Sequence, residues 1–440
     1  MLGFSTHDTG TLMSELNRAL GLPMLTFYGT GMILGAGIYT IIGKAAGVAG
    51  PNVWLSLVFA ALAATFAALS YCELAAMFPK VGGEYVYLKK AFPSFHWIAN
   101  SGGLMMSFAG IATASTVSLA FAGYLQQFFS FSPLLIAMGL LTIFTIINIL
   151  GIKESSWMNV IFTLIEISGL VIFIYIGIQS SNFGNALLSM PSLTTVTGSA
   201  LIIFAFFGFE NIVNFAEEVK NPQKNLPRAI LLSIGISTVL YILVALSAVS
   251  LMPINELAQS KAPLSDAIRN IAPKMAGALA GIALFATANT VLIALVTTSR
   301  ILFGMARENA LPLSFAKLHQ TRQTPWFSSI VTFILAACLL PLNKVEVLAS
   351  ISSFATMIAF IAVHVALITL RIQAPSQERP FRIPLSIKNI PILPVLGGAL
   401  TILLLFQFDE TVYIIGGVFL SIILVFQLIL KFLNKTHLKH

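Results

Sequence analysis

A short run of glycines carries the first chemistry that can be read from this chain of 440 residues. Gly35 and Gly37 flank Ala36 inside an apolar stretch, although glycine weakens a helix by roughly 1 kcal/mol relative to alanine. A helix broken here exposes N–H groups at the start of its second half and carbonyl groups at the end of its first half. Together these groups suit a ligand that carries both charges. Close packing against another helix, through the spacing of Gly31 and Gly35, is the alternative interpretation.

The composition indicates that the chain is surrounded by lipid rather than by water. It is 57% hydrophobic and 9% charged, with a mean hydropathy of +0.92, whereas a soluble domain carries roughly 25% charged residues. The net charge of +8 is spread over short loops between apolar runs, which excludes a nucleic-acid-binding surface. Cys72 and Cys338 lie in apolar segments and form neither a disulfide framework nor a metal-binding spacing. We therefore expect no metal and no cofactor.

Twelve apolar stretches are long enough to span a bilayer, which takes ~20 residues of helix. They are residues 23–46, 52–78, 95–129, 133–151, 156–179, 197–217, 227–251, 275–307, 324–341, 346–371, 391–407 and 411–432. In the alternative count, the short ninth or eleventh stretch is a re-entrant segment. Of the 24 lysines and arginines, 19 fall on one side of the twelve-span arrangement, so the positive-inside rule predicts that both termini are cytoplasmic. We expect a cytoplasmic segment 1–22, one transmembrane domain 23–432 and a cytoplasmic tail 433–440.

Two of these stretches are interrupted, the first and the sixth. The sixth contains Gly208 and, two residues later, Glu210. A carboxylate at membrane depth costs ~3 kcal/mol unless it faces a cavity or a partner. Matching breaks in the two halves of a chain are typical of transporters built from inverted repeats. The sequence therefore predicts an all-α membrane protein with repeats 23–179 and 197–371, discontinuous helices 1 and 6, and two added helices in 391–432.

Five motifs follow one another along the chain. They are GAGIY at 35–39, YCELAAMFPKVGGEYVYL at 71–88, GIKES at 151–155, FAFFGFENIVNFAEEVKNPQKNLPRAI at 204–230 and TSRILFGMARENALP at 298–312. In order and spacing, over nearly the whole chain, they resemble the amino acid–polyamine–organocation transporter superfamily, which has the leucine-transporter-type fold. The resemblance implies a secondary transporter of amino acids or related amines that works by alternating access.

The resemblance also implies a binding site made of backbone groups at the two breaks. The carboxylate of the substrate would meet the N–H groups of Ala36, Gly37 and Ile38. The amino group of the substrate would meet the carbonyl groups of Ile33, Phe204 and Phe207, next to Gly208. Phe204 occupies the position at which the family carries an aromatic gate over the substrate.

Several charged residues are candidates for coupling or gating. Glu166 lies about ten residues into the fifth stretch, ~15 Å from its end, where similar proton-coupled transporters carry a lysine. This departure leaves three roles open for Glu166: proton carrier, attraction of a cationic substrate or ion, or neutral structural hydrogen bonding. Glu210 matches an acidic position that the family often keeps, and either coupling or structural support fits it. Glu217, Glu218 and Arg228 would form an inner gate or, in the alternative, a solvated loop.

These features predict a secondary active transporter in the cytoplasmic membrane, a monomer or homodimer. We expect symport of a neutral or small amino acid with protons, driven by the transmembrane proton gradient. An exchanger of amino acids or amines, cationic ones included, is the first alternative. A membrane sensor that binds an amino acid without transporting it is an alternative of another class. The sequence contains neither an HExxH motif nor a serine nucleophile elbow, so we do not expect an enzyme.

Overall fold

Apolar helices make up almost all of the structure, a computed structural model. It describes residues 18–126, 129–188, 193–260, 262–342 and 345–406, and single residues or short pieces at 410, 413–414, 416–418, 421 and 425. The predicted terminal segments 1–22 and 433–440 and the predicted twelfth span, 411–432, lie mostly or entirely outside the described residues.

Fourteen α-helices follow one another in the described part of the chain. They are α1 (Leu22–Ala49), α2 (Val53–Met77), α3 (Gly83–Ala91), α4 (His96–Leu125), α5 (Pro133–Leu150), α6 (Ile152–Ile178), α7 (Leu193–Ile202), α8 (Pro222–Leu251), α9 (Ile254–Gln259), α10 (Pro263–Arg269), α11 (Pro273–Arg307), α12 (Trp326–Leu339), α13 (Val345–Gln373) and α14 (Ile392–Leu405). The 3-10 turns are η1 (Gly50–Asn52), η2 (Asn185–Leu188), η3 (Ile203–Phe206), η4 (Phe209–Phe215), η5 (Leu313–Ala316) and η6 (Leu340–Leu342). Strand β1 (Ser386–Ile387) pairs antiparallel with β2 (Ile390–Pro391). Proline begins several helices, among them α5, α8 and α11, where its fixed φ suits the first turn and its missing N–H costs nothing.

The predicted all-helical membrane architecture agrees with these elements. Within the described ranges, eight helices are long and apolar enough to cross a membrane. The number is nine if the bent pair Leu193–Ser199 and Ile203–Phe215, which turns by 41°, is one span. Helices α12 and α14 are apolar but shorter. The count of twelve spans stays a prediction.

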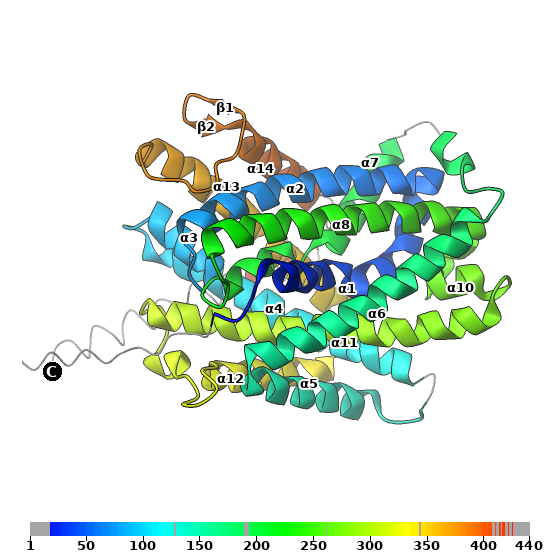
Figure 1. The fold of residues 1–440 in the computed structure, drawn as a ribbon, viewed down its shortest axis with the longest axis horizontal. Helices are drawn as coiled ribbons and strands as arrows, with labels where there is room; N and C mark the ends of the chain where they lie inside the picture. The colour runs from blue at the N-terminus through cyan, green and yellow to red at the C-terminus, as the bar shows by residue number, and fades with distance from the viewer. Residues whose placement is uncertain are drawn as a thin grey trace, which may run out of the picture.

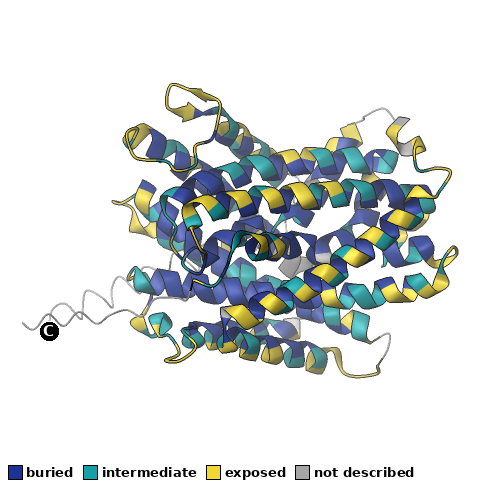
Figure 2. Cartoon of the chain, in the orientation of Figure 1, coloured by how far each residue is buried: buried dark blue, intermediate teal, exposed yellow. Residues whose placement is uncertain are grey.

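Helix α1 lies in the middle of the bundle, among long helices that run roughly along the long axis of the molecule (Figure 1). It packs against α6, α7, α8 and α11, and most of its side chains are buried (Figure 2). Helices α5 and α6 instead expose large apolar side chains such as Leu135 and Ile161. Apolar side chains on the outside suit a lipid surrounding, so the polar and broken parts of the chain are concentrated inside.

A buried cluster of charges fastens the loop between α13 and α14 to α2. Glu73, fully buried in α2, accepts hydrogen bonds from Arg371 Nε of α13 (2.8 Å) and from Arg379 Nε (3.1 Å). It also accepts a bond from the backbone N–H of Ile383 (2.8 Å). Arg371 Nη1 donates in turn to the hydroxyl of Ser386 at the start of β1 (2.6 Å). One carboxylate thus holds two arginines and the hairpin loop in place.

Replacing Glu73 with alanine would leave Arg371 buried without its carboxylate. Removing one member of a buried ion pair costs ~3–5 kcal/mol, so we expect Glu73→Ala to lower the free energy of unfolding by that amount. Thermal unfolding of the purified protein in detergent measures the effect. The matched control is Glu154→Ala, because Glu154 pairs with Arg322 at the exposed surface, where a pair contributes ~0–1 kcal/mol. Equal melting temperatures for the two variants would contradict this role of Glu73.

Candidate functional site

The first predicted break lies in the middle of α1. The backbone of Gly35 (φ −11°, ψ −159°) is not helical, so α1 consists of two half-helices. A Cβ atom on Gly35 would collide with the hydroxyl of Thr290 in α11, and a Cβ atom on Gly37 would lie 3.0 Å from the Cα of Ala205 in η3. The missing side chains therefore let the break approach two neighbouring elements closely.

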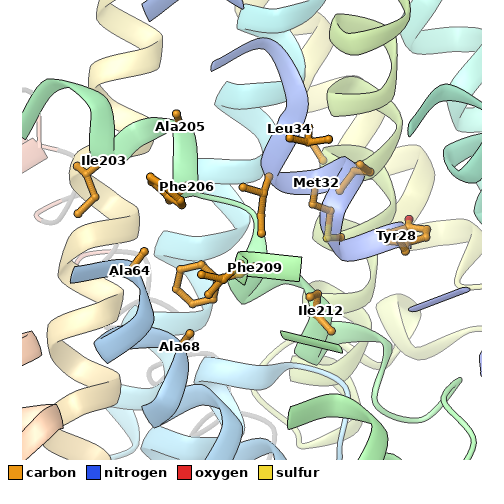
Figure 3. Close-up of a cluster of buried hydrophobic side chains, with 14 of the residues drawn as sticks. Tyr28, Met32, Leu34, Ala64, Ala68, Ile203, Ala205, Phe206, Phe209 and Ile212 are labelled. Carbon is orange, nitrogen blue, oxygen red and sulfur yellow. The ribbon is translucent and has the colours of Figure 1, made fainter. Parts of the chain in front are cut away.

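The second break lies between η3 and η4. Phe207 is extended (φ −66°, ψ 143°), and Gly208 takes a φ of +128°, which favours glycine because other residues are strained there. A Cβ atom on Gly208 would lie 2.6 Å from the carbonyl oxygen of Met32 in α1. The two breaks therefore lie against each other. Figure 3 shows side chains of α1, α2, η3 and η4 gathered around this meeting point.

Tyr241 of α8 connects the two breaks through one hydroxyl group. Its oxygen lies 2.5 Å from the carbonyl oxygen of Ile33 and 3.0 Å from that of Ala205. A tyrosine hydroxyl has one proton, so it donates to one of these carbonyl groups at a time. The Tyr241 ring is fully buried and packs edge-on against Phe206, with 5.3 Å between ring centroids. No sequence pattern marks Tyr241 for this role, because it sits in an ordinary apolar helix.

A cavity of about 110 Å³ opens where the two breaks meet. The broken helices contribute Met32, Ile33, Gly35, Gly37, Phe204, Ala205, Phe207, Gly208, Glu210 and Asn211 to its wall. Helices α4, α11 and α13 contribute Met106, Ala109, Gly110, Thr113, Val117, Thr290, Ile293, Ala294, Thr297, Ser352 and Thr356. The wall is mainly apolar, with hydroxyl groups and one carboxyl group. Among the described residues, no group of three or more histidine, cysteine or acidic side chains could hold a metal ion.

Most of the predicted binding residues lie in this wall. They are Ile33, Gly37, Phe204, Phe207 and Gly208. Ile38 is buried in the core and lies outside the wall, and the side chain of Ala36 is outside what the structure describes. The rings of Phe204 and Phe207 pack edge to face at 5.8 Å, and Phe207 meets Phe360 of α13 at 5.5 Å. These rings form an aromatic side of the cavity.

Glu210 supports the shape of the second break. Its Oε2 accepts a hydrogen bond from the N–H of Gly208 (2.8 Å), and its Oε1 accepts one from the side chain of Asn211 (3.0 Å). A carboxylate at such a position satisfies an N–H group that the break leaves without a helical partner. Glu210 is buried, and it is the charged side chain in the cavity wall.

Glu166 lies outside the cavity wall, in a buried polar cluster between α1, α6 and α11. The side chain of Asn159 donates to Asn289 Oδ1 (2.7 Å). Asn289 Nδ2 lies 3.4 Å from Glu166 Oε2, 3.4 Å from the hydroxyl of Thr163 and 3.5 Å from the carbonyl oxygen of Gly31. Glu166 Oε1 has no hydrogen-bond partner among the described residues, and no described cation pairs with this carboxyl group. The cluster therefore joins a buried carboxyl group to the first half of α1.

Glu218 pairs with an arginine that the sequence analysis did not single out. Arg300 of α11 is fully buried; its Nε donates to Glu218 Oε2 (2.9 Å) and its Nη1 to Asn148 Oδ1 of α5 (3.0 Å). Its guanidinium group also lies over the ring of Phe215, 5.5 Å from the centroid. An arginine inside an apolar stretch requires a partner, and this is the signal that could have pointed to Arg300. The network joins the end of the second broken helix to α5 and α11.

The other predicted gate residues are arranged differently. Glu217 pairs with Arg307 at the end of α11. Arg228 lies exposed near the start of α8, and no salt bridge joins it to another described residue. The structure therefore does not bring Arg228 to Glu217 or Glu218. The segment before α1 lies beside Glu218, because the N–H of Leu20 donates to the carbonyl of Glu218 (2.9 Å).

Without the hydroxyl group of Tyr241, the carbonyl groups of Ile33 and Ala205 would lose the hydrogen-bond donor that they share. A buried polar group without a partner costs ~1–3 kcal/mol, so we expect Tyr241→Phe to lower the free energy of unfolding by that amount. The control is Tyr175→Phe, because the Tyr175 side chain is 66% exposed on α6. Chemical unfolding in detergent compares the two variants. A Tyr241→Phe protein as stable as the control would contradict the bridging role.

Known membrane transporters resemble this chain over most of its length. The family model described as "Amino acid permease" matches residues 20–434. The branched-chain amino acid permease BcaP of Bacillus subtilis is 30% identical over 412 residues, covering 87% of this chain and 86% of that protein. The methylthioribose transporter of the same organism is 29% identical over 409 residues, with 88% and 87% covered. Cationic amino acid transporter 4 of Homo sapiens is 28% identical over 397 residues, covering 84% of this chain and 62% of that protein. The matched family consists of membrane transporters, not enzymes, and this chain is a multi-pass membrane protein that belongs to it, within the amino acid–polyamine–organocation superfamily.

Proposed function

We propose that this protein carries a neutral amino acid across the cytoplasmic membrane by alternating access, in symport with protons. The observation that carries the proposal is the cavity at which the two broken helices meet. The proposed architecture has twelve spans, with inverted repeats over 23–179 and 197–371 and both termini in the cytoplasm. Paired breaks at one cavity are the arrangement that such transporters use for binding.

Backbone groups at the breaks suit the part that all amino acids share. The proposed carboxylate contacts are the N–H groups of Ala36, Gly37 and Ile38. The proposed ammonium contacts are the carbonyl groups of Ile33, Phe204 and Phe207. The start of a half-helix carries a partial positive charge and the end of one a partial negative charge, so both charges of the substrate are stabilised. Tyr241 orients the carbonyl group of Ile33.

The rest of the cavity wall supports a substrate with an apolar side chain. Its apolar side chains include Met32, Ile33, Met106, Val117, Phe204, Phe207 and Ile293. Glu210 already bonds Gly208 and Asn211, so its charge is not free for a cation. Burying an apolar side chain gains about 25 cal/mol per Å². The relative named as a branched-chain amino acid permease supports the same class of substrate.

Exchange of cationic amino acids is the second candidate function. The observation that favours it is the carboxyl group of Glu210 in the cavity wall, together with relatives named cationic amino acid transporters. A lysine or arginine side chain would have to displace the bonds from Gly208 and Asn211. Uptake of labelled leucine and labelled lysine by liposomes containing the purified protein separates the two candidates.

A leucine at position 37 should abolish transport. Because a Cβ atom there already lies 3.0 Å from the Cα of Ala205, a longer side chain would fill the space proposed for the carboxylate. We expect Gly37→Leu to reduce leucine uptake at least a hundredfold. Gly235→Leu is the control, since no atom lies within 4 Å of a Cβ at that exposed position in α8. Normal uptake by the Gly37→Leu protein would refute the proposed site.

Glu166 is the proposed proton carrier because its buried carboxyl group has no cation partner among the described residues. Glutamine resembles the neutral acid but cannot release a proton. We expect Glu166→Gln to lose leucine uptake driven by an acidic exterior, at least tenfold, whereas the exposed Glu154→Gln keeps it. Uptake by the unmodified protein that does not depend on the pH gradient and requires internal amino acid would indicate exchange instead of symport. That result would also contradict the role of Glu166 as proton carrier.

A further inference from the structure

A second buried carboxyl group, Glu84 in α3, takes no part in the site described above. Its side chain is fully buried, and neither carboxylate oxygen has a hydrogen-bond partner among the described residues. The hydroxyl of Tyr71 in α2 and the N–H of Glu84 itself face the carboxylate without reaching normal hydrogen-bond geometry. Burying an ionised carboxylate without partners is strongly unfavourable. Glu84 therefore requires a proton or a positive charge.

No described cation of the neighbouring elements compensates Glu84. The arginines and lysines packed around α3 are engaged with other carboxylates, in the pairs Arg371–Glu73, Arg300–Glu218, Arg307–Glu217, Lys89–Glu308 and Lys80–Glu308. The imidazole of His364 in α13 bonds Ser70. The ionisable groups that act on Glu84 are Glu210 and the hydroxyl of Tyr71, and Glu84 acts in turn on the hydroxyl of Tyr87. Burial, with a contribution from the charge of Glu210, raises the pKa of Glu84 to about 7.

Tyr71 lies between the elements that carry Glu84 and Glu210. Its ring packs edge-on against Phe209, the neighbour of Glu210, at 5.8 Å, and against Tyr87, three residues after Glu84, at 6.4 Å. Both carboxyl groups act electrostatically on the Tyr71 hydroxyl. That hydroxyl is buried and has no hydrogen-bond partner among the described residues. The surroundings of Glu84 therefore include an unbonded hydroxyl group.

Asn214 adds a further unpartnered group where η4 faces α3. Its side chain is fully buried, and neither atom of its amide has a partner among the described residues. Asn214 Oδ1 lies 3.3 Å from the position of a Cβ atom on Gly83, next to Glu84. Buried polar groups in proteins normally have partners, so this collection of free acceptors and donors points to a site rather than to a packed core.

We propose that Glu84 is a proton-binding site and that its protonation is coupled electrostatically to the charge of Glu210. Two carboxyl groups close together in a low dielectric do not both ionise readily, so they titrate as a unit. The negative charge of Glu210 favours the protonated form of Glu84, and neutralising that charge lets Glu84 release its proton.

This coupling would link the proton on Glu84 to the charge of the cavity wall. Glu210 lines the cavity and Glu84 does not. The role of Glu84 in transport rests on the proposed symport with protons, whereas its protonation does not. One experiment therefore measures protonation and another measures coupled proton movement.

The pH dependence of stability tests protonation of Glu84. A pKa of about 7 in the folded protein against 4.5 in the unfolded chain means that the unfolded chain ionises first. The folded protein then loses stability as pH rises from about 4.5 to 7. We expect Glu84→Gln to melt at a higher temperature than the unmodified protein at pH 8 and to lose part of the decline between pH 5 and 8. The exposed Glu154→Gln should keep the unmodified profile. A Glu84→Gln protein with the unmodified pH profile would overturn the proposal.

Proton movement tests the connection to Glu210. Liposomes containing the protein and a pH-sensitive dye are mixed with external leucine, and internal acidification is followed. We expect Glu84→Gln to slow acidification at least tenfold, whereas the exposed Glu154→Gln should keep it. Undiminished acidification in the Glu84→Gln protein would overturn the coupling between Glu84 and Glu210. No acidification with the unmodified protein would instead refute the proposed symport and the transport role of Glu84, while the stability measurement still decides whether Glu84 binds a proton.

Discussion

A backbone N–H or carbonyl group inside a bilayer has no water to bond, so it must find its partner within the protein. Continuous helices meet this constraint along their length. Two helical segments of this protein are instead interrupted, at Gly35 and at Phe207–Gly208. The breaks are tolerated because they lie against each other in the middle of the bundle. Tyr241 serves carbonyl groups of both, and Glu210 serves an N–H group of the second. Residues at both breaks also line a cavity, which is why we propose that this cavity binds a zwitterion.

The same constraint separates the buried carboxyl groups into two kinds. Glu73 and Glu218 each have arginine partners, and these pairs fasten distant segments of the chain to one another. Glu166 and Glu84 are equally buried, but each has at least one carboxylate oxygen without a partner among the described residues. A buried acid without a cation is stable when it holds a proton. The paired groups are thus suited to structure, and for the unpaired groups we propose proton binding.

Local features could be predicted from the sequence, and distant partners could not. The position of the first break can be predicted from Gly35 and Gly37, because a missing Cβ atom weakens the helix locally, at the glycine itself. Glu166 and Glu210 stand out because a carboxyl group inside an apolar stretch is costly wherever the helix packs. Tyr241, in contrast, meets Ile33 across 208 residues, and Asn159 meets Asn289 across 130. Arg228 was expected beside Glu217 and Glu218 because it is near in sequence, yet arginines of α11, over 80 residues away, occupy those places.

A structure of the protein in lipid nanodiscs with bound leucine tests the central claim most directly, which is that the two breaks together form the substrate site. The claim predicts that the leucine carboxylate lies at the N–H groups after Gly35 and that the ammonium group lies at the carbonyl of Ile33. The side chain of leucine should then lie among Met106, Val117 and Ile293. Leucine bound away from both breaks, or at one break without contact to the other, would contradict the claim.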